Sequence, residues 1–364
     1  MHVSEIDTPA LVVDLDIFER NLAKVAAYAR EHALQLRPHT KTHKSVRLAR
    51  RQLASGANGL TVAKVSEAEV MASAEPASLL VAFPIIGQAK LARLTQVARE
   101  TPILVALDSS FAARQLSDAA RAARVEIGVL AEVDVGLGRV GVSPGDALIQ
   151  LAQVIEKLPH LRFAGITFYP GHIKSLDDTG RQALARLSAL VAEILGDFRA
   201  AGIEPGIVSG GSTPTLFHSH EVAGLTEIRP GTYVFNDLNT IHSGACELAD
   251  CAATVVATVV STARPGQMII DGGSKTFSSD RLASPSDVTF GRLVEAPGAR
   301  FHKMNEEHGF IDVTKAETTF DVGDRVHLIP NHICVAVNLH EKVYGLRGDK
   351  VEEIWPVDAR GKLQ

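Results

Sequence analysis

The feature that most constrains the fold of this chain is an alternation of β-rich apolar runs with amphipathic helical stretches, from Ala10 to about Leu238. Such alternation is typical of βα units around a parallel sheet. A first strand (Ala10–Asp14) and helix (Ile17–Glu31) precede eight apolar runs: Leu34–Arg37, Gly59–Ala63, Leu79–Phe83, Ile103–Leu107, Ile127–Val133, Phe163–Phe168, Gly206–Ser209 and Leu225–Ile228. Helical stretches follow most runs: Ser66–Ala72, Gln88–Arg99, Ser109–Ala122, Gly145–Lys157 and Gly180–Ala201. This pattern predicts an α/β fold with an N-terminal (β/α)8 TIM-type barrel.

Beyond about Asn239 the sequence changes to short β-like runs separated by Gly, Pro and Asp. These runs are Ala253–Ser261, Gln267–Asp271, Val288–Phe290, Gly309–Val313, Arg325–Ile329 and Cys334–Asn338. They predict a C-terminal antiparallel β domain of about 125 residues. We therefore expect a barrel domain over residues 8–238 and a β domain over residues 239–364, with residues 1–15 a candidate addition to the second.

Composition excludes several classes of protein. The 37 basic and 42 acidic residues give a net charge of −5, which argues against a nucleic-acid partner because phosphate binding needs a clustered basic excess. No apolar run approaches the roughly 18–20 residues of a membrane helix, and the N-terminal residues lack the features of a secretory signal. We therefore expect a cytoplasmic protein without a membrane partner.

The first barrel run ends in a cluster of basic residues, Arg37-Pro38-His39-Thr40-Lys41-Thr42-His43-Lys44. Barrel active sites are built at the C-terminal ends of strands. So many cationic groups would repel one another, so we expect at least one lowered pKa. A lysine that loses its proton readily can form a Schiff base with a carbonyl compound. A solvated basic loop explains the charges equally well.

A Gly- and hydroxyl-rich segment, Ser209-Gly210-Gly211-Ser212-Thr213-Pro214-Thr215, follows the seventh of the eight runs. Its backbone N–H groups and hydroxyls could hold an anion, and we expect a helix beginning near Thr213 to direct its positive end to the same place. Loops after strands seven and eight are the usual phosphate site of barrels. Without that location, an ordinary tight turn would be the better interpretation.

His332 and Cys334 lie two residues apart in a run expected to be a strand. On a strand they would project from the same face and could bind one ion together. Imidazole and thiolate favour zinc or another borderline-soft metal, and two protein ligands leave open positions. Two unrelated buried residues are the alternative. Cys246 and Cys251 have no matching His pair, so we interpret them as core thiols.

Two further loops carry candidate residues. Arg139, in Asp134-Val135-Gly136-Leu137-Gly138-Arg139-Val140-Gly141, could hold an anionic oxygen, although a surface arginine on a turn is an equal alternative. Tyr169 and His172 follow the sixth run, and His172 is a candidate acid/base with an ordinary structural histidine as its rival.

Taken together, these motifs resemble the alanine-racemase-type (fold-type III) pyridoxal phosphate enzymes. The resemblance rests on the Arg37–Lys44 segment, the Asp-x-Gly-x-x-Arg-x-Gly stretch ending at Gly141, and Arg229-Pro230-Gly231-Thr232-Tyr233. With Glu307-His308-Gly309 and His332-Ile333-Cys334 added, the chain is similar to the metal-activated branch: D-threonine aldolases, D-serine dehydratases and 3-hydroxyaspartate lyases.

The resemblance implies roles for individual residues. Lys41 would bind pyridoxal 5'-phosphate covalently, and His332 and Cys334 would bind a divalent metal (Zn, Mn or Mg). The cofactor-binding residues it implies are His39, Lys41, Arg139, Tyr169, Gly211, Ser212, Thr213 and Tyr233. It also implies a homodimer whose active sites are shared between the barrel of one subunit and the β domain of the other.

The reaction remains open between two outcomes on a β-hydroxy D-amino acid. If a base removes the hydroxyl proton, the Cα–Cβ bond breaks and glycine and an aldehyde result, as in D-threonine aldolases. If Lys41 instead removes the Cα proton, water leaves and a 2-oxo acid and ammonia follow, as in D-serine or D-3-hydroxyaspartate dehydratases. We favour the aldolase, with Lys41 and His172 as catalytic residues, although His39 and His308 are other acid/base candidates and the segment after Tyr169 departs from many aldolases. A non-catalytic cofactor carrier is a further alternative, against which Asn239–Gln364 counts.

Overall fold

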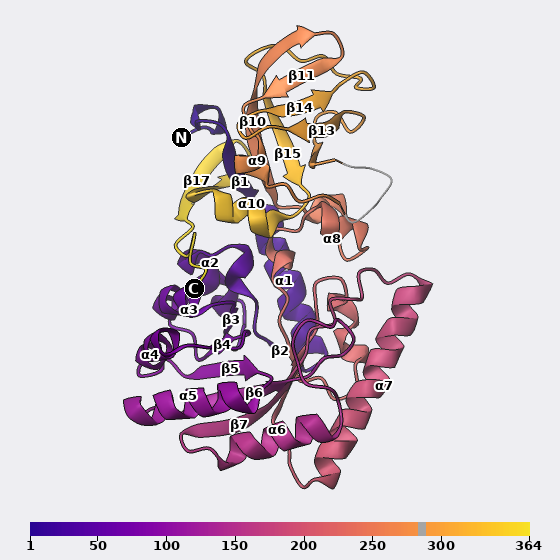
Figure 1. Ribbon diagram of the computed structural model, residues 1–364. Coiled ribbons are helices and arrows are strands. Elements are labelled where there is room, and N and C mark those ends of the chain that lie inside the picture. The colour runs from indigo at the N-terminus through magenta and orange to yellow at the C-terminus, as the bar shows by residue number, and fades with distance from the viewer. Residues whose placement is uncertain (283–288) are drawn as a thin grey trace. The chain divides into compact units, whose positions relative to one another are not determined.

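The computed structural model describes residues 1–282 and 289–364 (Figure 1). The chain divides into two compact units. The barrel unit comprises Lys24–Lys41, Val46–Gly231 and Gly361–Gln364, and the β unit comprises Met1–Ala23, Thr42–Ser45 and Thr232–Arg360. The β unit therefore takes residues from both ends of the sequence.

The barrel unit is built on eight parallel strands: β2 (Gln35–Leu36), β3 (Leu60–Val62), β4 (Leu79–Val81), β5 (Ile103–Leu107), β6 (Ile127–Glu132), β7 (Leu161–Thr167), β8 (Ile207–Gly210) and β9 (Glu227–Ile228). Their order in the sheet is β2-β9-β8-β7-β6-β5-β4-β3. A parallel bridge between His39 and Thr61 joins its two ends, and the Thr61 N–H donates to the Pro38 carbonyl oxygen at 2.9 Å. The predicted barrel fold is therefore confirmed.

Amphipathic helices connect these strands: α2 (Val46–Ala54), α3 (Val65–Met71), α4 (Gln88–Val97), α5 (Ser110–Ala123), α6 (Asp146–Lys157) and α7 (Asp178–Ala200). In α6, Leu148, Leu151, Ala152 and Ile155 are buried, which is the spacing of one helix face. Figure 1 shows α4, α5 and α6 along the strands of the barrel unit, and neighbouring helices contact each other.

The strands themselves are continuous apolar runs because the helices cover the outside of the sheet while the barrel interior is packed. All five residues of β5 are buried. At Gly165 in β7, φ is +144°, and a Cβ atom would lie 1.9 Å from the Ile207 carbonyl oxygen. Only glycine fits this close approach of β7 to β8.

The β unit contains the remaining strands: β1 (Ala10–Asp14), β10 (Ala253–Arg264), β11 (Gln267–Ile270), β12 (Gly291–Leu293), β13 (Arg300–Met304), β14 (Gly309–Asp312), β15 (Arg325–Pro330), β16 (Lys342–Arg347) and β17 (Lys350–Pro356). The main order is β13-β14-β11-β10-β1-β16-β17, and β15 pairs with β10 and β12. All pairs are antiparallel except β1 with β16. The sheet is thus mixed rather than purely antiparallel.

The core of the β unit forms around the start of α1 (Leu15–Glu31). The Phe18 ring centroid lies 5.7 Å from that of Trp355 and 6.2 Å from that of Phe235, and all three side chains are fully buried. Three short helices complete this unit: α8 (Leu238–His242), α9 (Ser274–Phe277) and α10 (Ile333–Leu339).

Two runs near the C-terminus differ from the predicted strands. The run Cys334–Asn338, predicted as a strand, lies in helix α10, where Ile333, Ala336 and Val337 are buried. That spacing of three and four residues is helical, and it overrides the β propensity of the run. In the predicted strand Val288–Phe290, residue 288 lies outside the described residues, and β12 begins only at Gly291.

Among the described residues, none of the helices combines the length and the apolar character needed to cross a bilayer.

Candidate active site

The predicted cofactor lysine follows β2 in the short 3-10 helix η2 (Thr40–Thr42). Two contacts hold this segment in place. The Thr40 hydroxyl donates to the Thr61 carbonyl oxygen at 3.1 Å, and the Lys41 backbone N–H donates to Nδ1 of His39 at 3.4 Å. The Lys41 side chain is exposed at the C-terminal end of its strand, where a ligand can reach it.

The cationic residues around Lys41 are directed to separate partners. In the barrel unit, Arg37 is buried and its Nε lies 2.7 Å from a carboxylate oxygen of Glu227. In the β unit, Nζ of Lys44 donates to the Asn338 side chain at 2.9 Å. These interactions relieve the repulsion that the sequence predicts.

A chain of polar contacts connects the ends of β8 and β9. The Ser209 hydroxyl donates to Glu227 at 2.6 Å and accepts a hydrogen bond from the guanidinium of Arg229, which also donates to the Phe168 carbonyl oxygen at 3.1 Å. Burial lowers the pKa of Arg229, while the charges of Glu227 and Glu132 oppose this shift. Sequence reasoning gave Arg229 no role, although it directly follows the eighth run and precedes Pro230-Gly231.

The loops after β6 and β7 lie against each other. The Arg139 guanidinium carbon is 5.1 Å from the Tyr169 ring centroid. The exposed His172 ring lies so close to Gly136 that a Cβ atom added to this glycine would be in van der Waals contact with the ring. Asp134 caps three consecutive N–H groups of its own loop at 3.0–3.1 Å. These bonds, led by that from Gly138, lower the pKa of Asp134. The structure therefore brings Arg139, Tyr169 and His172 together.

A buried carboxyl at the end of β6 has an atom without a partner. Glu132 is 7% exposed, and its Oε2 has no hydrogen-bond partner among the described residues. Burial raises its pKa, opposed by the charges of Arg229 and Arg139. The ends of β6, β7 and β9 thus collect two arginines, a phenol and a carboxyl, which fits a polar aromatic ligand bearing an anionic group.

The predicted phosphate loop forms a tight turn rather than a helix start. Gly211 has φ +91°, and the Ser212 hydroxyl lies 3.1 Å from the Thr215 hydroxyl. The expectation of a helix near Thr213 is wrong, because a 3-10 helix begins only at Leu216. Tyr233 belongs to the β unit, where it is buried in η5 (Thr232–Val234).

The predicted metal ligands meet in the β unit, although not by the predicted strand geometry. His332 is the N-cap residue of α10, Cys334 lies in its first turn, and the two side chains are hydrogen-bonded to each other. Nδ1 of His332 lies 3.1 Å from Oδ2 of Asp237, and the Thr42 hydroxyl lies 3.2 Å from Sγ of Cys334. Thr42 directly follows Lys41 in the sequence.

The electrostatics of this pair suit a metal. Burial alone would lower the pKa of His332, but the Cys334 thiolate and the hydrogen bonds to Asp237 and Cys334 raise it to about 11. Burial would raise the pKa of Cys334, but the His332 cation and the hydrogen bonds from His332 and Thr42 lower it. The thiol is therefore ready to lose its proton, as a metal ligand must. Within the described chain no group of three or more His, Cys, Asp or Glu side chains has an arrangement that could hold a metal ion.

Three other residues considered from the sequence, His308, Cys246 and Cys251, lie in the β unit. His308 is exposed in the turn between β13 and β14. Cys246 and Cys251 hydrogen-bond to each other, which with burial raises the pKa of Cys246. Cys251 packs with Leu238 in an apolar cluster, in agreement with its interpretation as a core thiol.

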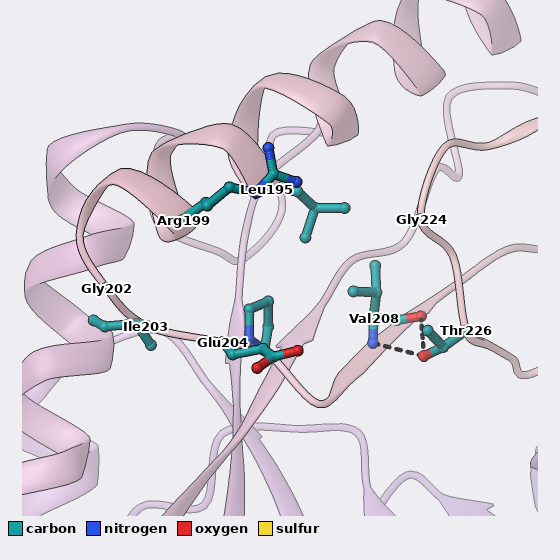
Figure 2. A pocket seen from close by; sticks show the side chains of 9 residues that line it. Leu195, Arg199, Gly202, Ile203, Glu204, Val208, Gly224 and Thr226 are labelled. Carbon is teal, nitrogen blue, oxygen red and sulfur yellow. Dashed lines mark hydrogen bonds between the residues drawn. The ribbon is translucent and has the colours of Figure 1, made fainter.

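A cavity of about 530 Å³ lies in the barrel unit beside the segments that precede β8 and β9 (Figure 2). Arg199 and Glu204 line it, and the Val208 N–H donates to the Thr226 hydroxyl at 2.9 Å. This is the N-terminal end of the strands, opposite to where barrel active sites are built. None of the predicted site residues lines it.

Comparison with known proteins defines the family. The model described as "Alanine racemase, N-terminal domain" matches residues 13–238, and that described as "Putative serine dehydratase domain" matches residues 252–346. The chain belongs to the alanine racemase N-terminal domain family. This confirms the fold-type III resemblance.

Individual relatives cover almost the whole chain. D-threonine aldolase of Arthrobacter sp. is 37% identical over 99% of this chain and 94% of its own length. D-threo-3-hydroxyaspartate dehydratase of Delftia sp. (strain HT23) is 32% identical over 96% of this chain and 97% of its own. The crystal structure of D-threonine aldolase from Filomicrobium marinum has a TM-score of 0.93 at 34% identity, covering 99% of this chain and 97% of that one. These relatives bear names of lyases, as predicted.

Proposed function

We propose that this chain is a lyase dependent on pyridoxal 5'-phosphate and a divalent metal, and that it cleaves D-threonine and similar β-hydroxy D-amino acids to glycine and an aldehyde. When bound, the cofactor accepts the electron pair left on Cα. In this proposal Lys41 holds the cofactor covalently. The other residues that bind it are His39, Arg139, Tyr169, Gly211, Ser212, Thr213 and Tyr233.

The observation that carries the proposal is the paired His332 and Cys334, with Asp237 behind the imidazole and Thr42 against the thiol. Imidazole and thiolate bind zinc well and can also hold manganese or magnesium more weakly. A metal held by two protein ligands retains open positions and supplies Lewis acidity toward a substrate oxygen. A cofactor carrier without turnover has no need of this pair.

His172 is our candidate for the base that removes the β-hydroxyl proton. Its side chain is exposed beside Gly136, on the same loops as Arg139 and Tyr169. Dehydration of D-serine or D-3-hydroxyaspartate is the second candidate function, since Lys41 could remove a Cα proton instead, and one relative of similar length is a dehydratase.

The decisive experiment compares products. Purified enzyme with cofactor and metal is incubated with D-threonine, D-serine and D-3-hydroxyaspartate, and glycine plus aldehyde is measured against 2-oxo acid plus ammonia. We expect glycine and acetaldehyde from D-threonine, and a His172→Gln loss of about 10²–10⁴-fold in kcat. Release of 2-oxo acid and ammonia in place of glycine would establish the dehydratase.

The ligand assignments have their own test. Borohydride reduction followed by peptide mass spectrometry is expected to place the cofactor on Lys41, and Lys41→Ala is expected to abolish this adduct. Chelation is expected to remove activity, and added Zn²⁺ or Mn²⁺ to restore it. Full activity in protein shown to be metal-free would refute the role of His332 and Cys334.

We also propose a cytoplasmic homodimer as the working form of the enzyme, on the basis of its family. Sedimentation velocity of the purified protein is expected to give twice the mass of one 38.8 kDa chain. Fractionation of the source cells is expected to recover it with cytoplasmic markers. A monomeric active species would refute the dimer.

A further inference from the structure

The Cys334 sulfur is contacted by two threonine hydroxyls from different segments. Oγ1 of Thr42, in η2, lies 3.2 Å from Sγ, and Oγ1 of Thr232, in η5, lies 3.7 Å from it. Thr42 is fully buried, so its hydroxyl needs a partner within the protein. A hydroxyl beside a thiolate donates to it, because the thiolate is the stronger acceptor.

His332, the other proposed metal ligand, is held just as closely by Asp237. Oδ2 of Asp237 lies 3.1 Å from Nδ1 of His332 and accepts the Ile333 N–H at 3.0 Å. Its Oδ1 accepts the backbone N–H and the hydroxyl of Thr240, at 2.8 and 2.7 Å. The carboxylate is fully buried, and all these bonds keep it in one orientation. It therefore keeps the His332 proton on Nδ1 and leaves Nε2 to act as a ligand.

We propose that Thr42 and Asp237 are positioning residues for the metal: Thr42 moderates the electron donation of Cys334, and Asp237 orients His332. This inference rests on the proposed metal dependence. A hydrogen bond to a thiolate lowers the energy of its lone pairs, so the sulfur donates less charge and the metal stays more acidic. Thr232 makes the same contact at longer distance and contributes less.

The test replaces the metal of the full-length protein with Co²⁺ and reads the sulfur-to-cobalt charge-transfer band as a difference against metal-free protein. Thr42→Val keeps the shape and removes the donor, so we expect the band to move to longer wavelength. Thr42→Ser retains the donor and is expected to restore the wild-type band. Thr232→Val should shift it less, and Thr314→Val, whose hydroxyl donates to Asp312 in an exposed turn, should not shift it.

Asp237 is tested by affinity. Competition with a chromophoric chelator is expected to show Co²⁺ binding weakened about 10–100-fold in Asp237→Asn, with the Thr314→Val control near wild type. An unchanged band in Thr42→Val, or an unchanged affinity in Asp237→Asn, overturns the corresponding half of this inference and leaves the proposed function standing. Wild-type protein that binds no Co²⁺ overturns both.

Discussion

The buried pair Arg37–Glu227 provides a sharp test of how the barrel unit is stabilised. The side chains are 4% and 2% exposed, and Nε of Arg37 lies 2.7 Å from Oε2 of Glu227. The second carboxylate oxygen accepts from Ser209, which also receives the Arg229 guanidinium. Glu227→Gln keeps the volume but removes the charge that balances the buried Arg37 and the half-buried Arg229.

Breaking a buried pair from one side leaves an uncompensated charge and costs about 3–5 kcal/mol. We expect that loss in urea unfolding followed by far-UV circular dichroism, as a midpoint about 1–1.7 M lower if m is about 3 kcal/mol/M. The double variant Arg37→Met/Glu227→Leu should cost less than Glu227→Gln, because no charge is then left buried.

The matched control is a surface pair of the same residue types in the same unit. Nε of Arg93 lies 2.7 Å from Glu69, but the side chains are 40% and 36% exposed. Solvent screens this pair, so Glu69→Gln should cost less than about 1 kcal/mol. Equal midpoint shifts in Glu227→Gln and Glu69→Gln would show that burial of the ion pair does not govern its contribution.

Three further predictions concern single positions. Burial lowers the pKa of His340 to about 4. The unfolded chain therefore binds a proton at this residue near pH 6.5, whereas the folded chain binds it only near pH 4. Stability should therefore fall between pH 6.5 and pH 4, by about 2 kcal/mol at pH 5, and the difference in thermal midpoint between pH 7 and pH 5 should be smaller in His340→Gln. Gly165→Ala should give insoluble or strongly destabilised protein on expression, because its Cβ would meet the Ile207 carbonyl oxygen; soluble protein of wild-type melting temperature would contradict this. Asp134→Ala should raise the cofactor Kd several-fold in a fluorescence titration by releasing the loop that carries Arg139, and an unchanged Kd would separate that loop from cofactor binding.

The barrel was predictable because its strands are coherent apolar runs. Ile103–Leu107 is a strand with the predicted bounds, five of the other runs contain one of the parallel strands, and the runs Phe163–Phe168 and Gly206–Ser209 overlap β7 and β8. The segment Cys334–Asn338 was wrongly predicted as a strand because Val335 and Val337 favour strands, whereas the buried residues Ile333, Ala336 and Val337 have the spacing of a helix face. The helix begins where the Ile333 N–H meets Asp237, 96 residues earlier in the chain. A partner so remote gives no local sequence signal.

The candidate residues Lys41, Arg139, His332 and Cys334 could be named from short motifs, although each motif taken alone also allows a structural interpretation. Their roles stay predictions. Asp237 was missed because its neighbours, Asn236 and Leu238, form no motif, and its role depends on contacts made in three dimensions. Such supporting residues are found only once the elements that converge on them are known.

The position of β1 has a consequence for how the protein is made. This strand pairs with β10 on one side and with β16 on the other. On the ribosome, Ala10–Asp14 leave the exit tunnel well before their neighbours, which are synthesised more than 200 residues later. Domains form in the order of their synthesis. The barrel strands can therefore assemble before the strands that pair with β1 have been synthesised. Nascent chains halted before Ala253 should therefore expose β1 with both of its hydrogen-bonding edges unpaired, as a segment that chaperones can bind.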